Sequence, residues 1–154
     1  MTLDDLDAMA VMLGDPVVMA YYPHPKTRDE ARAWIEWNLT NYRTHGYGLW
    51  ILETEDEKFV GDCGLTWQPV WGGHKLEIGY HVARSAQGQG FATEAARACS
   101  DFARDILYAD ELVAIIHPKN LASQRVAEKI GLAFLGTDGD DTTPNRSMVY
   151  GRSF

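Results

Sequence analysis

The segment from Val82 to Ala95 carries the residues whose types and spacing most directly suggest chemistry. Strand-forming residues lead into two glycines, Gly88 and Gly90, and a helix-forming run follows. Glycine adopts left-handed dihedrals and lets a ligand approach the backbone closely. The N–H groups from Gly88 to Thr93 would then converge at a helix N-terminus, where the helix dipole favours phosphate oxygens. The segment predicts either a pyrophosphate site built from backbone alone or a plain strand-to-helix turn.

Two other classes of phosphate-binding turn do not fit this segment. A P-loop needs Gly-Lys followed by Ser or Thr, and the sequence contains no Gly-Lys. A dinucleotide-binding turn needs a third glycine where Thr93 stands, and an acidic residue closing the next strand. Asp110 and Glu111 precede that strand instead.

The elements that position this turn can be predicted from periodicity and capping signals. Thr2 and Thr27 open two amphipathic helices, the second ending before Gly46. We expect strands over 48–54, 59–67, 75–82, 111–117, 133–136 and 147–154, with helices over 91–107 and 121–130. The helix over 91–107 is expected to face inward through Phe91, Ala95, Ala98, Cys99, Phe102 and Ile106. Loops are expected over 68–74 and 137–145.

This order predicts an α/β fold with helices on both faces of a mixed sheet. The strand–helix–strand unit from Lys75 to His117 implies a parallel pair joined by a right-handed crossover, and the hairpins imply antiparallel neighbours. We expect residues 1–154 to form a single domain.

Composition excludes several classes of function. The chain has 14 Lys and Arg against 22 Asp and Glu, a net charge of −8, which argues against nucleic-acid binding. No apolar run approaches the ~20 residues of a membrane helix, and the acidic start lacks a signal-peptide pattern. Two cysteines make no disulfide framework, and the five histidines show no metal-ligand spacing, so we expect a cytoplasmic protein without a metal.

The turn resembles the acyl-CoA pyrophosphate signature of the GNAT acetyltransferases, Gln/Arg-x-x-Gly-x-Gly/Ala, through Gln87, Gly90 and Ala92. Two further motifs are similar to the RimJ/RimL branch, which acetylates the N-termini of ribosomal proteins. Glu77-Ile78-Gly79-Tyr80 stands before the turn, and a later motif matches through Asn120, Ser123, Glu128, Lys129 and Gly131. The resemblance covers roughly Thr2 to the C-terminus and implies the GNAT fold.

One feature departs from that family. The family usually begins with a strand rich in Leu and Arg before the first helix, whereas this chain begins in that helix. We therefore expect either a sheet one strand short or a truncated chain, which affects the sheet edge and part of the acceptor wall.

The resemblance implies an N-acetyltransferase that moves an acetyl group directly from acetyl-CoA to a primary amine, acting as a monomer or homodimer. The pantetheine arm is expected to lie between the strands over 75–82 and 111–117, with a backbone N–H near His81 or Val82 polarising the thioester carbonyl. The expected cofactor-binding residues are His81, Val82, Gln87, Gly88, Gln89, Gly90, Phe91, Ala92, Thr93, Asn120, Ser123 and Lys129. Arg84, Lys119 and Arg125 are further candidate phosphate cations.

Three residues are candidates for the catalytic chemistry. An alkyl amine with a pKa near 10.4 must lose a proton before it attacks, so a base is needed. Glu77 is the first candidate, with room beside it over Gly79, and His81 on the same strand face is the second. Ser123 is the candidate donor to the leaving thiolate, since the Tyr that many relatives carry seven residues after Asn120 is Ala127 here. Each of these side chains has a plain structural reading as well.

The acceptor is expected to be cationic. Acidic clusters at 4–7, 53–57 and 138–141 would concentrate such an amine, and Trp34, Trp37 and Trp71 are candidate lining residues of an acceptor cleft. The rival hypothesis is a catalytically silent acyl-CoA-binding or scaffold protein. An O-acyl or longer-chain acyl transferase is a third possibility.

Overall fold

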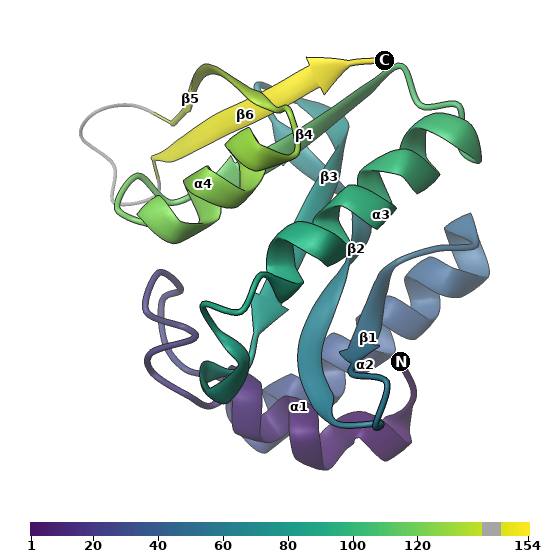
Figure 1. Ribbon diagram of the computed structural model, residues 1–154, viewed down its shortest axis with the longest axis vertical. Coiled ribbons are helices and arrows are strands. Elements are labelled where there is room, and N and C mark those ends of the chain that lie inside the picture. Colours follow the sequence, from purple (N-terminus) through teal and green to yellow (C-terminus); the bar gives the residue numbers. More distant parts are fainter. Residues whose placement is uncertain (140–145) are drawn as a thin grey trace. The chain divides into compact units, whose positions relative to one another are not determined.

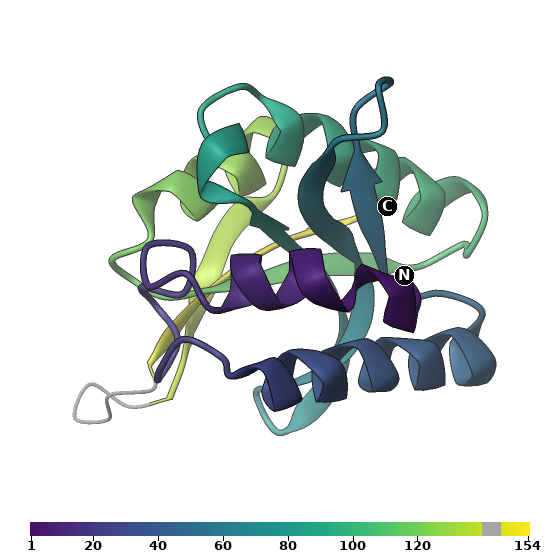
Figure 2. The same ribbon diagram turned by 90° about the horizontal axis from the view of Figure 1, so that it is seen from below.

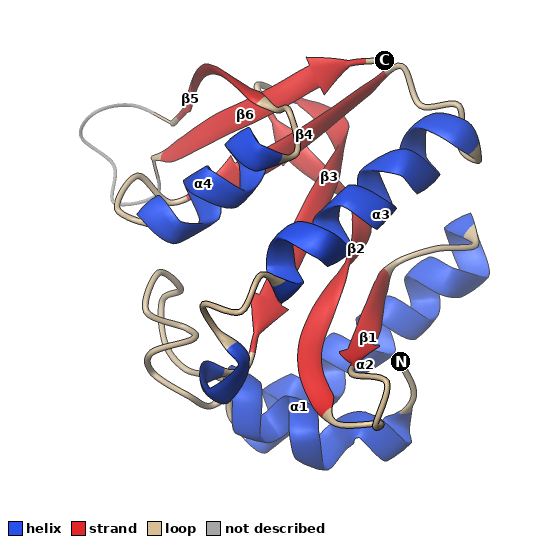
Figure 3. Ribbon diagram, viewed as in Figure 1, coloured by secondary structure: helices blue, strands red, loops and turns tan. Residues whose placement is uncertain are grey.

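A computed structural model describes residues 1–139 and 146–154 (Figure 1). The helices are α1 (Leu6–Leu13), α2 (Arg28–His45), α3 (Phe91–Asp105) and α4 (Leu121–Lys129), with 3₁₀ turns at Leu3–Asp5 and Arg84–Ala86. The strands are β1 (Leu49–Glu53), β2 (Phe59–Val70), β3 (Gly73–Val82), β4 (Glu111–Ile116), β5 (Ala133–Asp138) and β6 (Ser147–Ser153) (Figure 3). This order of helices and strands is the one predicted from the sequence.

The strands form one six-stranded sheet in the order β1-β2-β3-β4-β6-β5. β3 and β4 pair in parallel, whereas β1 with β2, β4 with β6, and β5 with β6 pair antiparallel. The predicted mixed α/β sheet is therefore confirmed. The parallel pair has a single matched position, Glu77 with Val113, while every residue of β4 is matched with a residue of β6.

The chain divides into two compact units, which are described separately. The first comprises residues 1–64 and 80–92, and the second comprises residues 65–79 and 93–154. Strands β2 and β3 contribute residues to both units. The expectation of a single domain over residues 1–154 stays a prediction.

In the first unit, α1 lies against α2 and the two helices share an apolar core (Figure 2). That core contains the fully buried side chains Met9, Leu13, Met19 and Ile35. The helix starts follow the capping signals in the sequence: Thr27 accepts from the Glu30 N–H, and the Glu30 carboxylate accepts from the Thr27 N–H. Gly46 ends α2 in a left-handed conformation with φ of 81°.

In the second unit, β4 is buried along most of its length, and the fully buried Val70, Val113 and Val149 pack together. The predicted inward face of α3 is confirmed at Cys99 and wrong at the other predicted residues. Its buried residues are Ala96, Cys99, Ser100 and Ala103, while Ile106 is exposed. Small residues at these positions let the helix backbone lie close to its neighbours, which an assignment by large apolar residues does not detect.

The predicted loop over 68–74 is also wrong. β2 runs to Val70 and β3 begins at Gly73, so only Trp71 and Gly72 turn, both with left-handed φ. The loop predicted over 137–145 begins in β5, and residues 140–145, including two of the acidic cluster at 138–141, lie outside the described residues. Within the described ranges, no helix combines the length and apolar character that crossing a membrane requires.

Candidate functional site

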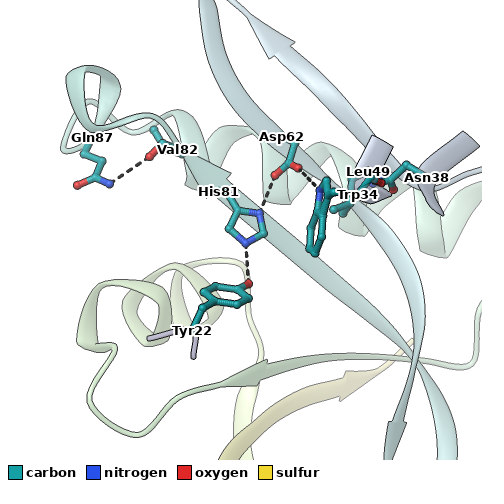
Figure 4. Close-up of polar contacts among 8 residues, drawn as sticks. All are labelled: Tyr22, Trp34, Asn38, Leu49, Asp62, His81, Val82 and Gln87. Atoms are coloured by element: carbon teal, nitrogen blue, oxygen red, sulfur yellow. Dashed lines mark hydrogen bonds and ion pairs between the residues drawn. The ribbon is translucent and has the colours of Figure 1, made fainter. Parts of the chain in front are cut away.

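The turn that follows β3 in the first unit presents its backbone to solvent. Residues 87–90 are exposed, and Gly88 and Gly90 have φ values of 76° and 93°, a region that favours glycine. Gln87 Nε2 donates to the Val82 carbonyl at 3.1 Å, and Gln89 Nε2 donates to the Ser85 carbonyl at 3.1 Å (Figure 4 shows the first). The two glutamine side chains therefore stabilise the turn through hydrogen bonds to carbonyl groups of the residues before it.

The turn leads directly into α3, whose first residues are Phe91 and Ala92, followed by Thr93. A helix N-terminus has free N–H groups and a partial positive charge. Together with the left-handed glycines, this arrangement fits a pyrophosphate held by backbone groups.

The first unit also contains a buried histidine–carboxylate pair. His81 Nδ1 lies 2.7 Å from Asp62 Oδ1, and the Asp62 carboxylate is completely buried. The other carboxylate oxygen accepts from Trp34 Nε1 at 3.1 Å (Figure 4). An ionised carboxylate only accepts hydrogen bonds, so the proton between the pair is carried by His81 Nδ1. The arrangement fixes the orientation of the imidazole.

On its other side, the His81 ring contacts Tyr22. His81 Nε2 lies 2.6 Å from the Tyr22 hydroxyl, and the two ring centroids are 5.5 Å apart. Tyr22 comes from the segment between α1 and α2, where its N–H donates to the carbonyl of the buried Met19 at 3.0 Å. Residues from three separate parts of the chain therefore meet at His81.

The aromatic residues predicted to line an acceptor cleft are in two places. Trp34 and Trp37 lie together on α2 with ring centroids 5.4 Å apart, and the Lys26 ammonium lies 5.2 Å from the Trp34 ring centre. Trp71 belongs to the second unit, where its indole N–H donates to the Thr137 carbonyl at 3.0 Å. An aromatic surface that already holds a cation is suited to an ammonium group.

Glu77 lies in the second unit at the single matched position of β3 and β4. Its Oε1 accepts from the Ile115 backbone N–H at 3.4 Å, and the residue is half-buried. The carboxylate therefore supplies a partner for a strand N–H next to the point where regular pairing stops. This contact neither requires nor prevents a role as a base.

The later motif also lies in the second unit. The Asn120 side chain accepts from the Ser123 N–H at 3.1 Å and caps α4, as predicted. Ser123 is half-buried, Lys129 is exposed near the helix end, and Ala127 is completely buried. A tyrosine at position 127 would therefore have no room without a change in packing.

The structure thus places His81 and residues 87–92 of the turn in the first unit. The other predicted site residues are in the second unit: Glu77, Thr93, Asn120, Ser123 and Lys129. Sequence reasoning missed Tyr22 and Asp62. Asp62 could have been found, because it is a lone carboxylate inside the apolar run 59–67. Tyr22 had no comparable signal. Across residues 1–139 and 146–154, no group of three or more His, Cys, Asp or Glu is arranged to hold a metal.

Comparison with known proteins gives consistent matches. The family model described as "Acetyltransferase (GNAT) domain" matches residues 1–133. The uncharacterized protein YkkB of Bacillus subtilis (strain 168) is 39% identical over 135 residues, which cover 87% of this chain and 78% of YkkB.

Two solved structures show the fold. The acetyltransferase from Agrobacterium tumefaciens str. C58 is 24% identical with a TM-score of 0.83, covering 100% of this chain and 88% of its own. The ribosomal-protein-alanine N-acetyltransferase from Brucella melitensis is 20% identical with a TM-score of 0.76, covering 100% of this chain and 97% of its own.

Proposed function

The chain belongs to the GNAT acetyltransferase family, whose acyl donor is acetyl-CoA, and we propose that it binds acetyl-CoA and transfers the acetyl group by direct attack of a primary amine. The observation that carries this proposal is the turn after β3, with its two left-handed glycines and the exposed residues 87–90. It supports binding of the cofactor pyrophosphate at residues 87–93. Asn120, Ser123, Lys129 and the backbone of His81 and Val82 are the remaining proposed cofactor contacts.

The acceptor must reach the thioester as a neutral amine, and two residues are proposed as its base. Glu77 is supported by its half-buried carboxylate, whose Oε1 already faces one backbone donor. His81 is supported by the buried Asp62, because a carboxylate on Nδ1 stabilises the imidazolium that forms when Nε2 takes a proton. We place His81 first, because Asp62 holds its ring in one orientation.

Two variants separate the candidates. Glu77→Gln is isosteric and His81→Gln is a polar replacement, and each removes the titrating group. A positioned base contributes typically 10²–10⁴-fold. The variant of the true base loses kcat and the acid limb of the pH profile with CoA affinity unchanged, whereas the other stays within a few-fold of wild type. If both stay within fivefold, neither residue is the base.

We propose a cationic amine as the acceptor, on the basis of charge and of the resemblance to the RimJ/RimL branch. The resemblance to RimJ/RimL enzymes supports a protein N-terminus, and the Brucella structure is named for that reaction. The cation already over Trp34 supports an ammonium-bearing acceptor. Exposed charges interact over only about 8 Å at physiological salt, so kcat/KM for such an acceptor falls as salt rises while CoA affinity changes less. A salt-independent kcat/KM points to a neutral acceptor.

Thiol release from acetyl-CoA, measured across a panel of peptides with free N-termini, polyamines and small aromatic amines, tests the function itself. The product is identified by mass, and its stability to hydroxylamine separates an amide from an O-acetyl ester. CoA binding without transfer to any amine would instead support a silent acyl-CoA-binding protein.

A further inference from the structure

We propose that Tyr22, His81 and Asp62 form a proton relay, with the Tyr22 hydroxyl as the group that takes the proton from the acceptor. This inference rests on the proposed function, in which an ammonium group must be deprotonated before it attacks. It assigns a catalytic role to Tyr22 and a positioning role to Asp62. The three residues come from the segment before α2, from β3 and from β2.

Asp62, at the buried end of the relay, holds the His81 ring in one tautomer and one orientation. Asp62 is completely buried, and each of its carboxylate oxygens has a partner: His81 Nδ1 at 2.7 Å and Trp34 Nε1 at 3.1 Å. A buried carboxylate with two donors cannot rotate without losing a hydrogen bond, which is costly in a low-dielectric interior. Asp62 therefore keeps the proton on Nδ1 and leaves the lone pair of Nε2 directed away from it.

That lone pair is directed at Tyr22. The hydroxyl lies 2.6 Å from Nε2, and since Nε2 carries no proton in this tautomer, the hydroxyl is the donor. Such a short contact between phenol and imidazole is the geometry in which a proton passes between them.

The difference in exposure favours Tyr22 as the group that meets the acceptor. His81 is 9% exposed as a residue, whereas Tyr22 is 41% exposed. Tyr22 therefore offers a substrate amine more surface to approach than His81 does. The Trp34 ring, with centroid 5.5 Å from that of His81 and with the Lys26 ammonium above it, adds a surface that attracts cations.

The proposed step conserves atoms and charge. One N–H bond of the acceptor ammonium breaks, and its proton forms an O–H bond to the Tyr22 oxygen. In concert, the original Tyr22 O–H bond breaks and its proton forms an N–H bond to His81 Nε2. The products are a neutral amine, an unchanged tyrosine and an imidazolium whose charge is balanced by Asp62. After transfer, the imidazolium returns its proton through the Tyr22 hydroxyl to solvent. The second proton, which the nitrogen loses as the amide forms and the C–S bond breaks, goes to the leaving CoA thiolate.

The titratable groups on the ring come from different elements. β2 contributes Asp62, and the segment before α2 contributes Tyr22. The same segment contributes the Lys26 ammonium, which lies 5.2 Å from the ring centre of the uncharged Trp34 on α2. We expect the acid limb of the pH profile of kcat to depend on His81. We expect the pH at which this limb lies to differ in Asp62→Asn, which removes the carboxylate charge.

Tyr22→Phe is the central variant, and Tyr21→Phe is its matched control, because the neighbouring Tyr21 is also 41% exposed. With an amine on which wild type is active, Tyr22→Phe lowers kcat at least tenfold with KM and CoA affinity within about threefold. Tyr21→Phe stays within twofold of wild type. If Tyr22→Phe keeps kcat within twofold while His81→Gln loses it, Tyr22 is not in the relay.

A readout without activity separates the relay from the function. In ¹⁵N-labelled protein, we expect the neutral His81 ring to carry its proton on Nδ1, and we expect Tyr22→Phe to move the Nε2 resonance while Tyr21→Phe does not. Asp62→Asn can present an amide N–H to Nδ1 and so shifts the ring toward the Nε2–H tautomer. Wild type with its proton on Nε2 would overturn the relay whether or not the protein acetylates amines. The expected tautomer with no transfer to any amine would overturn the function and the catalytic role, leaving only the hydrogen bonds.

Discussion

A Cβ atom on Gly61 would lie 2.0 Å from the carbonyl oxygen of His81. No side chain fits at that distance, so the approach of β2 to β3 beside Asp62 requires glycine. This contact joins the two strands that carry the histidine–carboxylate pair, and it determines how far apart they lie.

We therefore predict that Gly61→Ala lowers both stability and kcat. Forcing a methyl group into a packed site typically costs about 1–3 kcal/mol, and the strand shift that relieves it moves His81 away from Asp62. Urea unfolding and steady-state kinetics measure the two effects. Gly73→Ala is the control, because a Cβ there has its nearest neighbour, the Val70 carbonyl oxygen, at 3.9 Å. Equal behaviour of the two variants would contradict the prediction.

A second prediction concerns the turn. Gly90→Asp places a carboxylate where a phosphate is proposed to bind, and we expect loss of CoA affinity by calorimetry with the fold retained. A Cβ at Gly90 meets nothing within 4 Å, although its φ of 93° strains any L side chain. Gly90→Ala carries that strain without the charge, so it keeps measurable CoA binding. Wild-type affinity in Gly90→Asp would move the phosphate site elsewhere.

Ser123 offers a third prediction. If its hydroxyl donates to the leaving thiolate, Ser123→Ala lowers kcat modestly, since water replaces the donor in part, and the loss shrinks with acyl donors whose thiols are more acidic. The Asn120 cap uses the Ser123 backbone N–H, so the variant keeps α4. A kcat unchanged with every donor would leave Ser123 as a helix-start residue only.

The sequence predicted the order of elements because most of its signals are local. Thr27 with Glu30 marks a helix start, and Gly88 with Gly90 marks a turn, within a few residues of the effect. The errors arose where tertiary packing, and not the local sequence, determines the structure. The inward face of α3 depends on how closely small residues pack, and the turn at Trp71 is far shorter than its composition suggested.

The candidate site divides in the same way. Alternation along β3 identified His81 as a candidate, but its partners are 59 and 19 residues away in sequence. Nothing in the spacing of Tyr22 and His81 indicates a contact, because only the folded path of the segment before α2 brings them together. Long-range polar partners follow from topology and not from local patterns.

Alkaline pH gives a fourth prediction. Burial, followed by repulsion from Asp62 and Asp5, raises the pKa of Tyr42 to about 12 from 10.0. The unfolded chain therefore ionises this group first, and the free energy of unfolding falls as pH rises from about 10 to about 12. Tyr42 donates to the Leu49 carbonyl, so Tyr42→Phe loses about 1 kcal/mol near neutral pH. The tyrosinate absorbance of wild type minus that of Tyr42→Phe isolates the ionisation of Tyr42, and we expect this difference to titrate near pH 12. A difference that titrates near pH 10 would contradict the prediction.

Acid pH gives a fifth prediction. The Thr27 N–H, and then the His24 side chain, lower the pKa of Glu30 to about 2 from 4.5. The ionised group therefore stabilises the fold above about pH 4.5, and this contribution is lost as pH falls toward about 2. Thermal melts should show Glu30→Gln less stable than wild type at pH 6 and equal to it near pH 2. Glu36→Gln, beyond the first turn of α2, is the control, and a pH-independent difference would argue against the capping charge.

The edge contact between the Trp34 and His81 rings has a spectroscopic consequence. Their centroids are 5.5 Å apart at an interplanar angle of 81°. A protonated imidazole accepts an electron from excited indole and quenches its emission, whereas a neutral imidazole quenches weakly. The emission of Trp34, obtained as the difference between wild type and Trp34→Phe, therefore reports the protonation state of His81. Stopped-flow measurement of this emission would give the rates at which His81 gains and loses its proton during turnover.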